Sequence, residues 1–139
     1  MPFKDISQIA GSAMAAQTVR LNTIASNLAN AESVSGTEEQ TYRARKPVFA
    51  AVMDGASGEQ GGGARVQVLD VVESAEPLRK VYEPGHPLAN GEGMVFYPNV
   101  NQVAEMTDMM SASRAFETNV EVLGRIKSMQ ASLLKLGEA

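Results

Sequence analysis

The sequence predicts a mainly α fold with a small β element (α+β), in which long N- and C-terminal helices pack as a coaxial or coiled-coil pair. Apolar residues recur at helical spacing at both ends, whereas residues 32–98 hold five of the six prolines and nine of the twelve glycines. Only seven residues are aromatic and none is tryptophan, so we expect a thin core. We therefore expect residues 1–31 and 99–139 to form one helical domain, with a small β-rich middle domain over residues 32–98.

The N-terminal segment is predicted to be one helix over residues 5–31. Asp5 with Gln8 has the spacing of a capping box at its start. The helix carries few charges (Lys4, Asp5 and Arg20), so both of its faces are expected to meet protein. The predicted apolar stripe is Ile6, Ala10, Ala13, Gln17, Leu21, Ile24, Leu28 and Ala31.

The middle segment combines strand patterns with turn residues. Residues 42–52, 65–72 and 78–82 are predicted strands, and Pro47 confines the first of them to a sheet edge or a bulge. The glycines of Gly55–Gly63 predict a flexible loop or hairpin tip. This segment holds ten of the sixteen acidic and six of the twelve basic residues, so the whole net charge of −4 lies here.

The C-terminal segment predicts a longer helix over residues 99–136. Pro98 precedes it, Asn99 with Gln102 is the predicted cap, and Gly137 ends it. Its apolar stripe is Met109, Ala112, Phe116, Asn119, Leu123, Ile126, Gln130 and Leu133, and a second row beside it is Val103, Met106 and Met110.

The lengths of the two helices indicate assembly with other protein chains. At about 1.5 Å per residue they extend roughly 39 Å and 57 Å. One helix cannot cover the whole apolar stripe of the other, so part of each stripe is left for a partner. We interpret Met106, Met109 and Met110 as a protein interface rather than as core. Whether the C-terminal helix kinks at Gly124 is not decided by the sequence.

The sequence lacks the residues that catalysis and ligand binding need. The chain has no cysteine and one histidine, which excludes disulfides, thiolate metal sites and histidine pairs. His86, in a Gly-His-Pro turn, leaves a small hydrolase as a weak alternative. The Gly61–Gly63 run lacks the ending of a phosphate loop, and no basic stripe is present for nucleic acid. We expect no enzyme, no cofactor, no metal and, without an apolar run of ~18 residues, no membrane insertion.

Three motifs resemble signatures of the flagellar axial rod protein family. The first, Ile24-Ala25-Ser26-Asn27-Leu28-Ala29-Asn30-Ala31, resembles its N-terminal signature. The second is Pro98-Asn99-Val100-Asn101 with the run from Glu105 to Val120, and it resembles the C-terminal signature of the proximal-rod members. The third, Tyr82-Glu83-Pro84-Gly85-His86-Pro87, resembles their central segment. The similarity spans essentially the whole chain; Phe116 stands where tyrosine is usual.

The resemblance implies a structural subunit of the bacterial flagellar basal-body rod in the periplasm. It implies type III export without a cleaved signal peptide, followed by helical assembly. The terminal helices would line the export channel, the middle would face outward, and the rod would transmit torque. The implied partners are copies of the chain itself, other proximal and distal rod subunits, the adaptor at the export gate and rod base, and the export apparatus. The alternative is a helical adaptor that binds one protein partner through its Met-rich face.

The expected assembly interface joins the inner ends of both helices to the Met-rich face. Asparagines at the inner ends are expected to bond backbone there or to tie neighbouring chains together. The predicted interface residues are Ile24, Asn27, Leu28, Asn30, Asn99, Asn101, Met106, Met109, Met110, Arg114, Phe116, Asn119 and Leu123.

Overall fold

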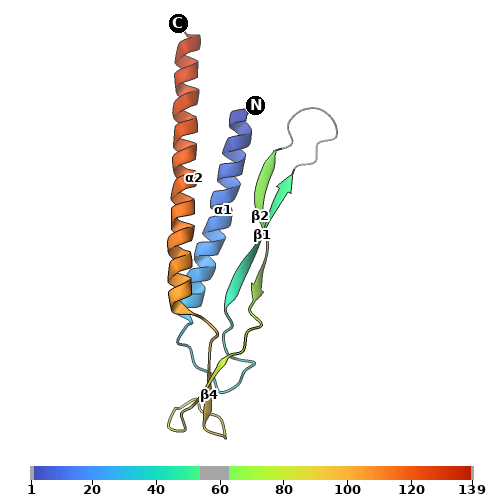
Figure 1. Ribbon diagram of the computed structural model, residues 1–139, viewed down its shortest axis with the longest axis vertical. Helices are drawn as coiled ribbons and strands as arrows, with labels where there is room; N and C mark the ends of the chain where they lie inside the picture. The colour runs from blue at the N-terminus through green and yellow to red at the C-terminus, as the bar shows by residue number, and fades with distance from the viewer. Residues whose placement is uncertain (1, 54–62, 139) are drawn as a thin grey trace.

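The computed structural model describes residues 2–53 and 63–138. Two long helices and a long β-hairpin lie side by side, and a smaller β-hairpin lies at one end (Figure 1). The mainly helical α+β fold with paired terminal helices is therefore confirmed. The elements are α1 (Pro2–Ala29), β1 (Arg45–Met53), β2 (Ala64–Glu73), β3 (Arg79–Tyr82), β4 (Met94–Tyr97) and α2 (Gln102–Gly137).

Helix α1 is the centre of the molecule. It packs against α2 on one side and against β1 and β2 on the other, whereas α2 contacts α1 alone among the described helices and strands. The apolar residues of α1 that this packing buries are small or aliphatic: Ala10, Ala16 and Ile24. Contacts on two sides account for part of the low charge of α1. A third side, which includes Gln8, Ala15 and Asn22, is exposed in the subunit, so the prediction that both faces meet protein is only partly confirmed.

The starts of both helices differ from the prediction. Helix α1 begins at Pro2. Proline is accepted in the first turn of a helix because the backbone N–H that it lacks would have no intrahelical partner there. The predicted cap at Asp5 is therefore wrong, and that residue lies in the first turn. Helix α2 is capped by Asn101, whose side-chain oxygen accepts from the Ala104 N–H at 3.2 Å. The predicted cap at Asn99 is wrong because its amide is bonded elsewhere.

Helix α2 is unbroken from Gln102 to Gly137 and continues through Gly124. It has 36 residues against 28 in α1. Its C-terminal end consequently extends beyond the N-terminal end of α1, and both chain termini lie toward the same end of the molecule (Figure 1). The part of α2 past Ile126 is exposed on all sides.

The long hairpin has the strands and the irregularity that its sequence predicts. β1 and β2 pair antiparallel, with Arg45 opposite Glu73, and the register shifts between Val48 and Phe49, directly after Pro47. A bulge near that proline agrees with the prediction, because proline cannot donate to the ladder. The predicted Gly55–Gly63 loop lies, apart from Gly63, outside the described residues.

Of the two strands of the small hairpin, β3 was predicted and β4 was not. β3 pairs with β4, not with the long hairpin. β4 carries the best-buried apolar residues of this end, Val95 and Phe96. Phe96 also exchanges two backbone hydrogen bonds with Ser35, at 2.8 Å and 3.1 Å, so the segment that follows α1 is tied to β4.

Replacing Gly93 by alanine is expected to destabilise this end by about 1–2 kcal/mol, because Gly93 has φ +74° in the left-handed region. An added Cβ would lie 2.9 Å from Tyr82 Cε2 and 3.1 Å from Pro84 Cβ. Gly91→Ala is the matched control, since no atom lies within 4 Å of its added Cβ. Urea denaturation followed by circular dichroism measures both variants, and equal stabilities would contradict the prediction.

Candidate assembly interface

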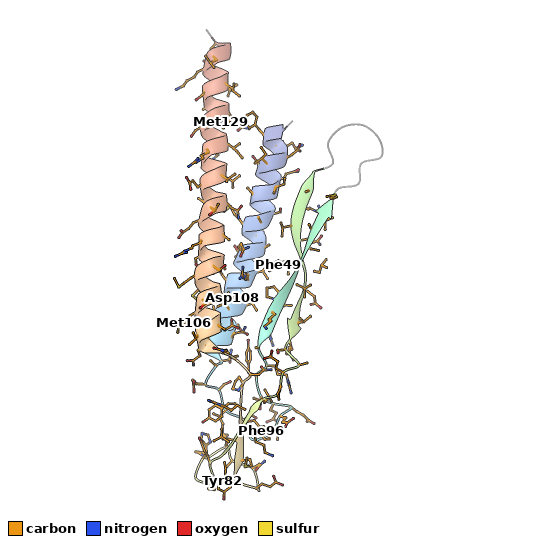
Figure 2. The ribbon with its side chains drawn as sticks, viewed as in Figure 1. Phe49, Tyr82, Phe96, Met106, Asp108 and Met129 are labelled. Atoms are coloured by element: carbon orange, nitrogen blue, oxygen red, sulfur yellow. The ribbon has the colours of Figure 1, made fainter. Side chains whose placement is uncertain are left out.

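The outer side of α2 carries an uncovered apolar row. This outer row consists of Val103, Met106 and Met110, which expose 74%, 57% and 61% of their surface. Figure 2 shows Met106 on the side of α2 that faces away from α1. The subunit itself buries neither Met106 nor Met110, so these two methionines are not part of its core. Met109 is half-buried.

The inner side of α2 faces α1 and holds several of the predicted interface residues. Phe116, Asn119 and Leu123 are half-buried there, and Ala112 is completely buried. Asn119 donates to the Ala115 carbonyl of its own helix at 2.8 Å. These positions therefore serve the α1–α2 contact within one chain.

The end of α2 presents a second apolar surface that the predicted interface did not include. Met129, Leu133, Leu134 and Leu136 are all more than half exposed on this part of the helix. Figure 2 shows Met129 high on α2, near the level at which α1 begins. The signal in the sequence was the greater length of the second helix, because residues beyond the partner helix have nothing in the chain to cover them.

Polar contacts join α2 to α1 and to the segment that follows α1. The Arg20 guanidinium donates to Asp108 at 2.9 Å, and the Gln102 amide donates to Glu32 at 2.9 Å. The Asp108 side chain is 58% exposed. An ion pair this exposed adds roughly 0–1 kcal/mol, so it contributes to alignment more than to stability.

Asn27 lies inside the subunit, where α1 meets the start of β1. It is 1% exposed, and its side-chain oxygen accepts from the Tyr42 hydroxyl at 2.8 Å and from the Arg45 N–H at 2.9 Å. Its amide nitrogen donates to the Arg45 carbonyl at 2.8 Å. Ile24 is also buried, one turn earlier. Both of these predicted interface residues are therefore buried inside the subunit.

Asn99 reaches the same place from the other side. Its oxygen accepts from the Ala44 N–H at 2.7 Å, and its amide nitrogen donates to the Glu76 carbonyl at 2.9 Å. Asn30, in contrast, lies one residue past the end of α1, and its amide donates back to the Ser26 carbonyl of that helix at 2.8 Å. The expectation that these asparagines bond backbone agrees with this geometry. Leu28 is half-buried and Arg114 is exposed.

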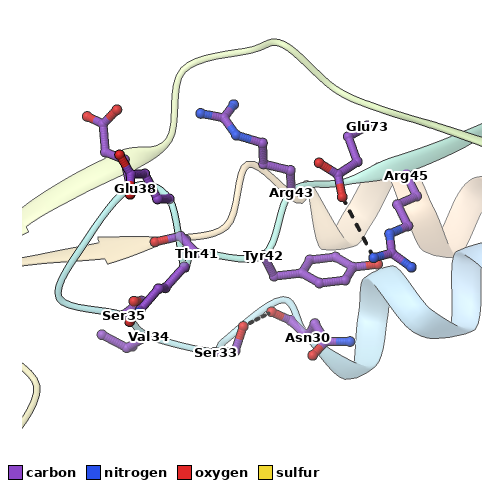
Figure 3. Close-up of a pocket in the computed structure, with 12 residues that line it drawn as sticks. Asn30, Ser33, Val34, Ser35, Glu38, Thr41, Tyr42, Arg43, Arg45 and Glu73 are labelled. Atoms are coloured by element: carbon purple, nitrogen blue, oxygen red, sulfur yellow. Dashed lines mark hydrogen bonds and ion pairs between the residues drawn. The ribbon is translucent and has the colours of Figure 1, made fainter.

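A polar depression of about 700 Å³ opens beside this junction (Figure 3). Charged side chains of both signs line it, and Arg45 reaches Glu73 at 3.7 Å across its edge. Over residues 2–53 and 63–138, no group of three or more histidine, cysteine or acidic side chains is placed to hold a metal ion. The depression contains no arrangement that indicates catalysis.

The small hairpin has its own polar contacts. The Tyr97 ring lies under the Arg79 guanidinium, 4.4 Å from ring centre to Cζ, and its hydroxyl donates to Glu83 at 3.3 Å. Desolvation by burial and then the Glu83 carboxylate raise the pKa of the Tyr97 hydroxyl above its ordinary value. His86 accepts from the Leu88 N–H at 3.1 Å within its turn.

Neither of the described helices has a stretch that is long and apolar enough to cross a membrane.

Two segments of the chain match families of known proteins. Residues 8–36 match "Flagella basal body rod protein", and residues 92–136 match "Flagellar basal body rod FlgEFG protein C-terminal".

Full-length relatives carry the same description. The chain is 51% identical over 138 residues to the flagellar basal-body rod protein FlgC of Salmonella typhimurium, which covers 99% of this chain and 100% of the relative. The corresponding FlgC of Yersinia enterocolitica is 44% identical over the same shares of both chains. The FlgC of Agrobacterium fabrum is 34% identical over 139 residues, or 99% of this chain and 97% of the relative.

Proposed function

The chain belongs to the flagellar basal-body rod protein family, with FlgC proteins as its full-length relatives, and from this premise we propose how it works in the rod. As a member of that family it is a structural subunit of the flagellar basal body. The proposal is that copies assemble helically through their terminal helices, so that the rod transmits torque and lines the export channel. The role is structural rather than enzymatic.

The observation that carries the proposal is the uncovered apolar surface of α2. The outer row and the C-terminal end of the helix expose large aliphatic side chains that α1 does not reach. A helix depends on tertiary packing for most of its stability, so this half-covered helix needs further neighbours. Contacts that join different surfaces of successive copies and do not close into a ring build a helical filament.

The proposed contact residues are those of the predicted interface that the subunit leaves exposed, together with the end of α2: Asn101, Met106, Met110 and Arg114. Their partners are neighbouring copies and other proximal and distal rod subunits. The export apparatus and the adaptor at the rod base are proposed as further partners. The middle of the chain, with the long hairpin, is proposed to face outward.

Cross-linking of purified basal bodies tests helical assembly against the single-partner adaptor. The chain has no cysteine, so a variant with both Met110→Cys and Leu133→Cys has two reactive positions on different parts of α2. A bifunctional maleimide is expected to join it into a ladder of oligomers. Each single-cysteine variant is the control, because one site per chain allows a pair and nothing longer. One discrete band from the double variant would favour the adaptor.

A further inference from the structure

Both segments that match the rod family form hydrogen bonds with the same short stretch of the middle segment, which lies outside the two matches. Asn27 lies in the matched residues 8–36, and Asn99 lies in the matched residues 92–136. Their amides bond the adjacent residues Arg45 and Ala44, where the chain enters β1. Helix α1 and the lead-in to α2 therefore meet at the base of the long hairpin.

The side-chain amide of Asn27 pairs with the main chain of Arg45 as a residue of a neighbouring strand would. A side-chain amide has one carbonyl acceptor and an N–H donor side by side, as the main chain of a strand does. Asn27 uses the acceptor for the Arg45 N–H and the donor for the Arg45 carbonyl, at 2.9 Å and 2.8 Å. The Tyr42 hydroxyl, which donates to the Asn27 oxygen at 2.8 Å, holds the amide in this orientation.

Asn99 completes the junction from the opposite end of the chain. It accepts from the Ala44 N–H and donates to the carbonyl of Glu76, just past the end of β2. The Ala44 carbonyl in turn accepts from the Ser74 N–H at 2.7 Å. Both sides of the hairpin base are thus bonded, and these contacts of Asn99 are made to main-chain atoms.

We propose that Asn27 and Asn99 form an amide lock that docks the base of the β1–β2 hairpin onto the two helical ends within one subunit. Because the lock engages backbone at residues 44, 45 and 76, it tolerates different side chains in the middle segment. The two asparagines therefore position the hairpin rather than contact a neighbouring copy. The lock is a property of the single chain and does not depend on the proposed assembly.

The distance between α1 and the hairpin measures the lock directly. Spin labels at Asn22→Cys on α1 and Gln67→Cys on β2, both exposed positions of this cysteine-free chain, report that distance by pulsed electron spin resonance. In the purified monomer we expect one narrow distribution. Asn27→Ala or Asn99→Ala is expected to raise the undocked fraction about tenfold or more, because each change removes at least two hydrogen bonds and takes the partner away from part-buried backbone groups.

Two control variants separate the lock from general damage. Asn30→Ala removes an amide that lies one residue past the end of α1 and bonds back to the Ser26 carbonyl, and Arg45→Ala removes a side chain while keeping the backbone that the lock engages. Both are expected to keep the narrow distribution. If Asn27→Ala does not fold, Tyr42→Phe replaces it and is expected to undock the hairpin to a smaller extent. An unchanged distribution in the asparagine variants, or equal broadening in the Asn30 control, overturns the lock.

Discussion

Replacing Met110 by aspartate is expected to abolish rod assembly and motility while the isolated chain folds normally. Met110 is 61% exposed in the subunit, so a charge there meets water in the monomer. In the proposed assembly the same position is buried against another helix, where a methionine contributes ~1.5–3 kcal/mol. An unpaired carboxylate at that place adds a desolvation cost, and the cost recurs at every copy in the rod.

The measurement combines swimming in soft agar with detection of the chain in purified basal bodies. Ser111→Asp is the matched control, because it adds the same charge at the next exposed position, on another side of α2. The control is expected to swim, and both variants are expected to give the helical circular dichroism of the parent chain. Normal rods containing the Met110 variant would show that the outer row is not an assembly surface.

Replacing Ala112 by leucine is expected to lower the free energy of unfolding by about 1–3 kcal/mol in the isolated chain. Ala112 has no exposed surface and lies on the side of α2 that packs against α1. Because Ala112 is completely buried, three further carbons cannot be accommodated there without moving the helices apart.

Urea denaturation of the purified chain measures this effect. Ala131→Leu is the control, since it adds the same group to an exposed position of the same helix and is expected to leave stability within about 0.5 kcal/mol. An Ala112 variant as stable as the parent would contradict close packing of α1 on α2. The two predictions act on opposite sides of α2, one on the subunit and the other on its proposed assembly.

Both long helices could be predicted because their signal is local and repeated. Apolar positions three or four residues apart run through most of α1 and α2, and the ends were placed within about three residues. β4 could not be predicted in this way. Its four residues, Met94–Tyr97, are all apolar or aromatic and show no alternation. Its strand conformation comes from pairing with β3 and with Ser35.

The candidate interface could be predicted in kind but not in every residue. The excess of apolar stripe over what two helices can cover predicted an interface, and Met106 and Met110 are indeed uncovered in the subunit. The same reasoning could not assign the asparagines. Asn27 bonds a residue 18 positions away, and Asn99 bonds one 55 positions away, so their partners depend on tertiary structure that no spacing shows.

The contact between α1 and α2 also sets the order in which the chain can fold. It joins segments far apart in the sequence, as the pair Arg20 and Asp108, 88 positions apart, shows. Closing so long a loop is costly in entropy and slow, whereas β1 and β2 are neighbours in sequence and can pair early. A chain delivered residue by residue therefore completes its helical pair last. Until the final helix arrives, the side of α1 that packs against α2 has no partner within the chain.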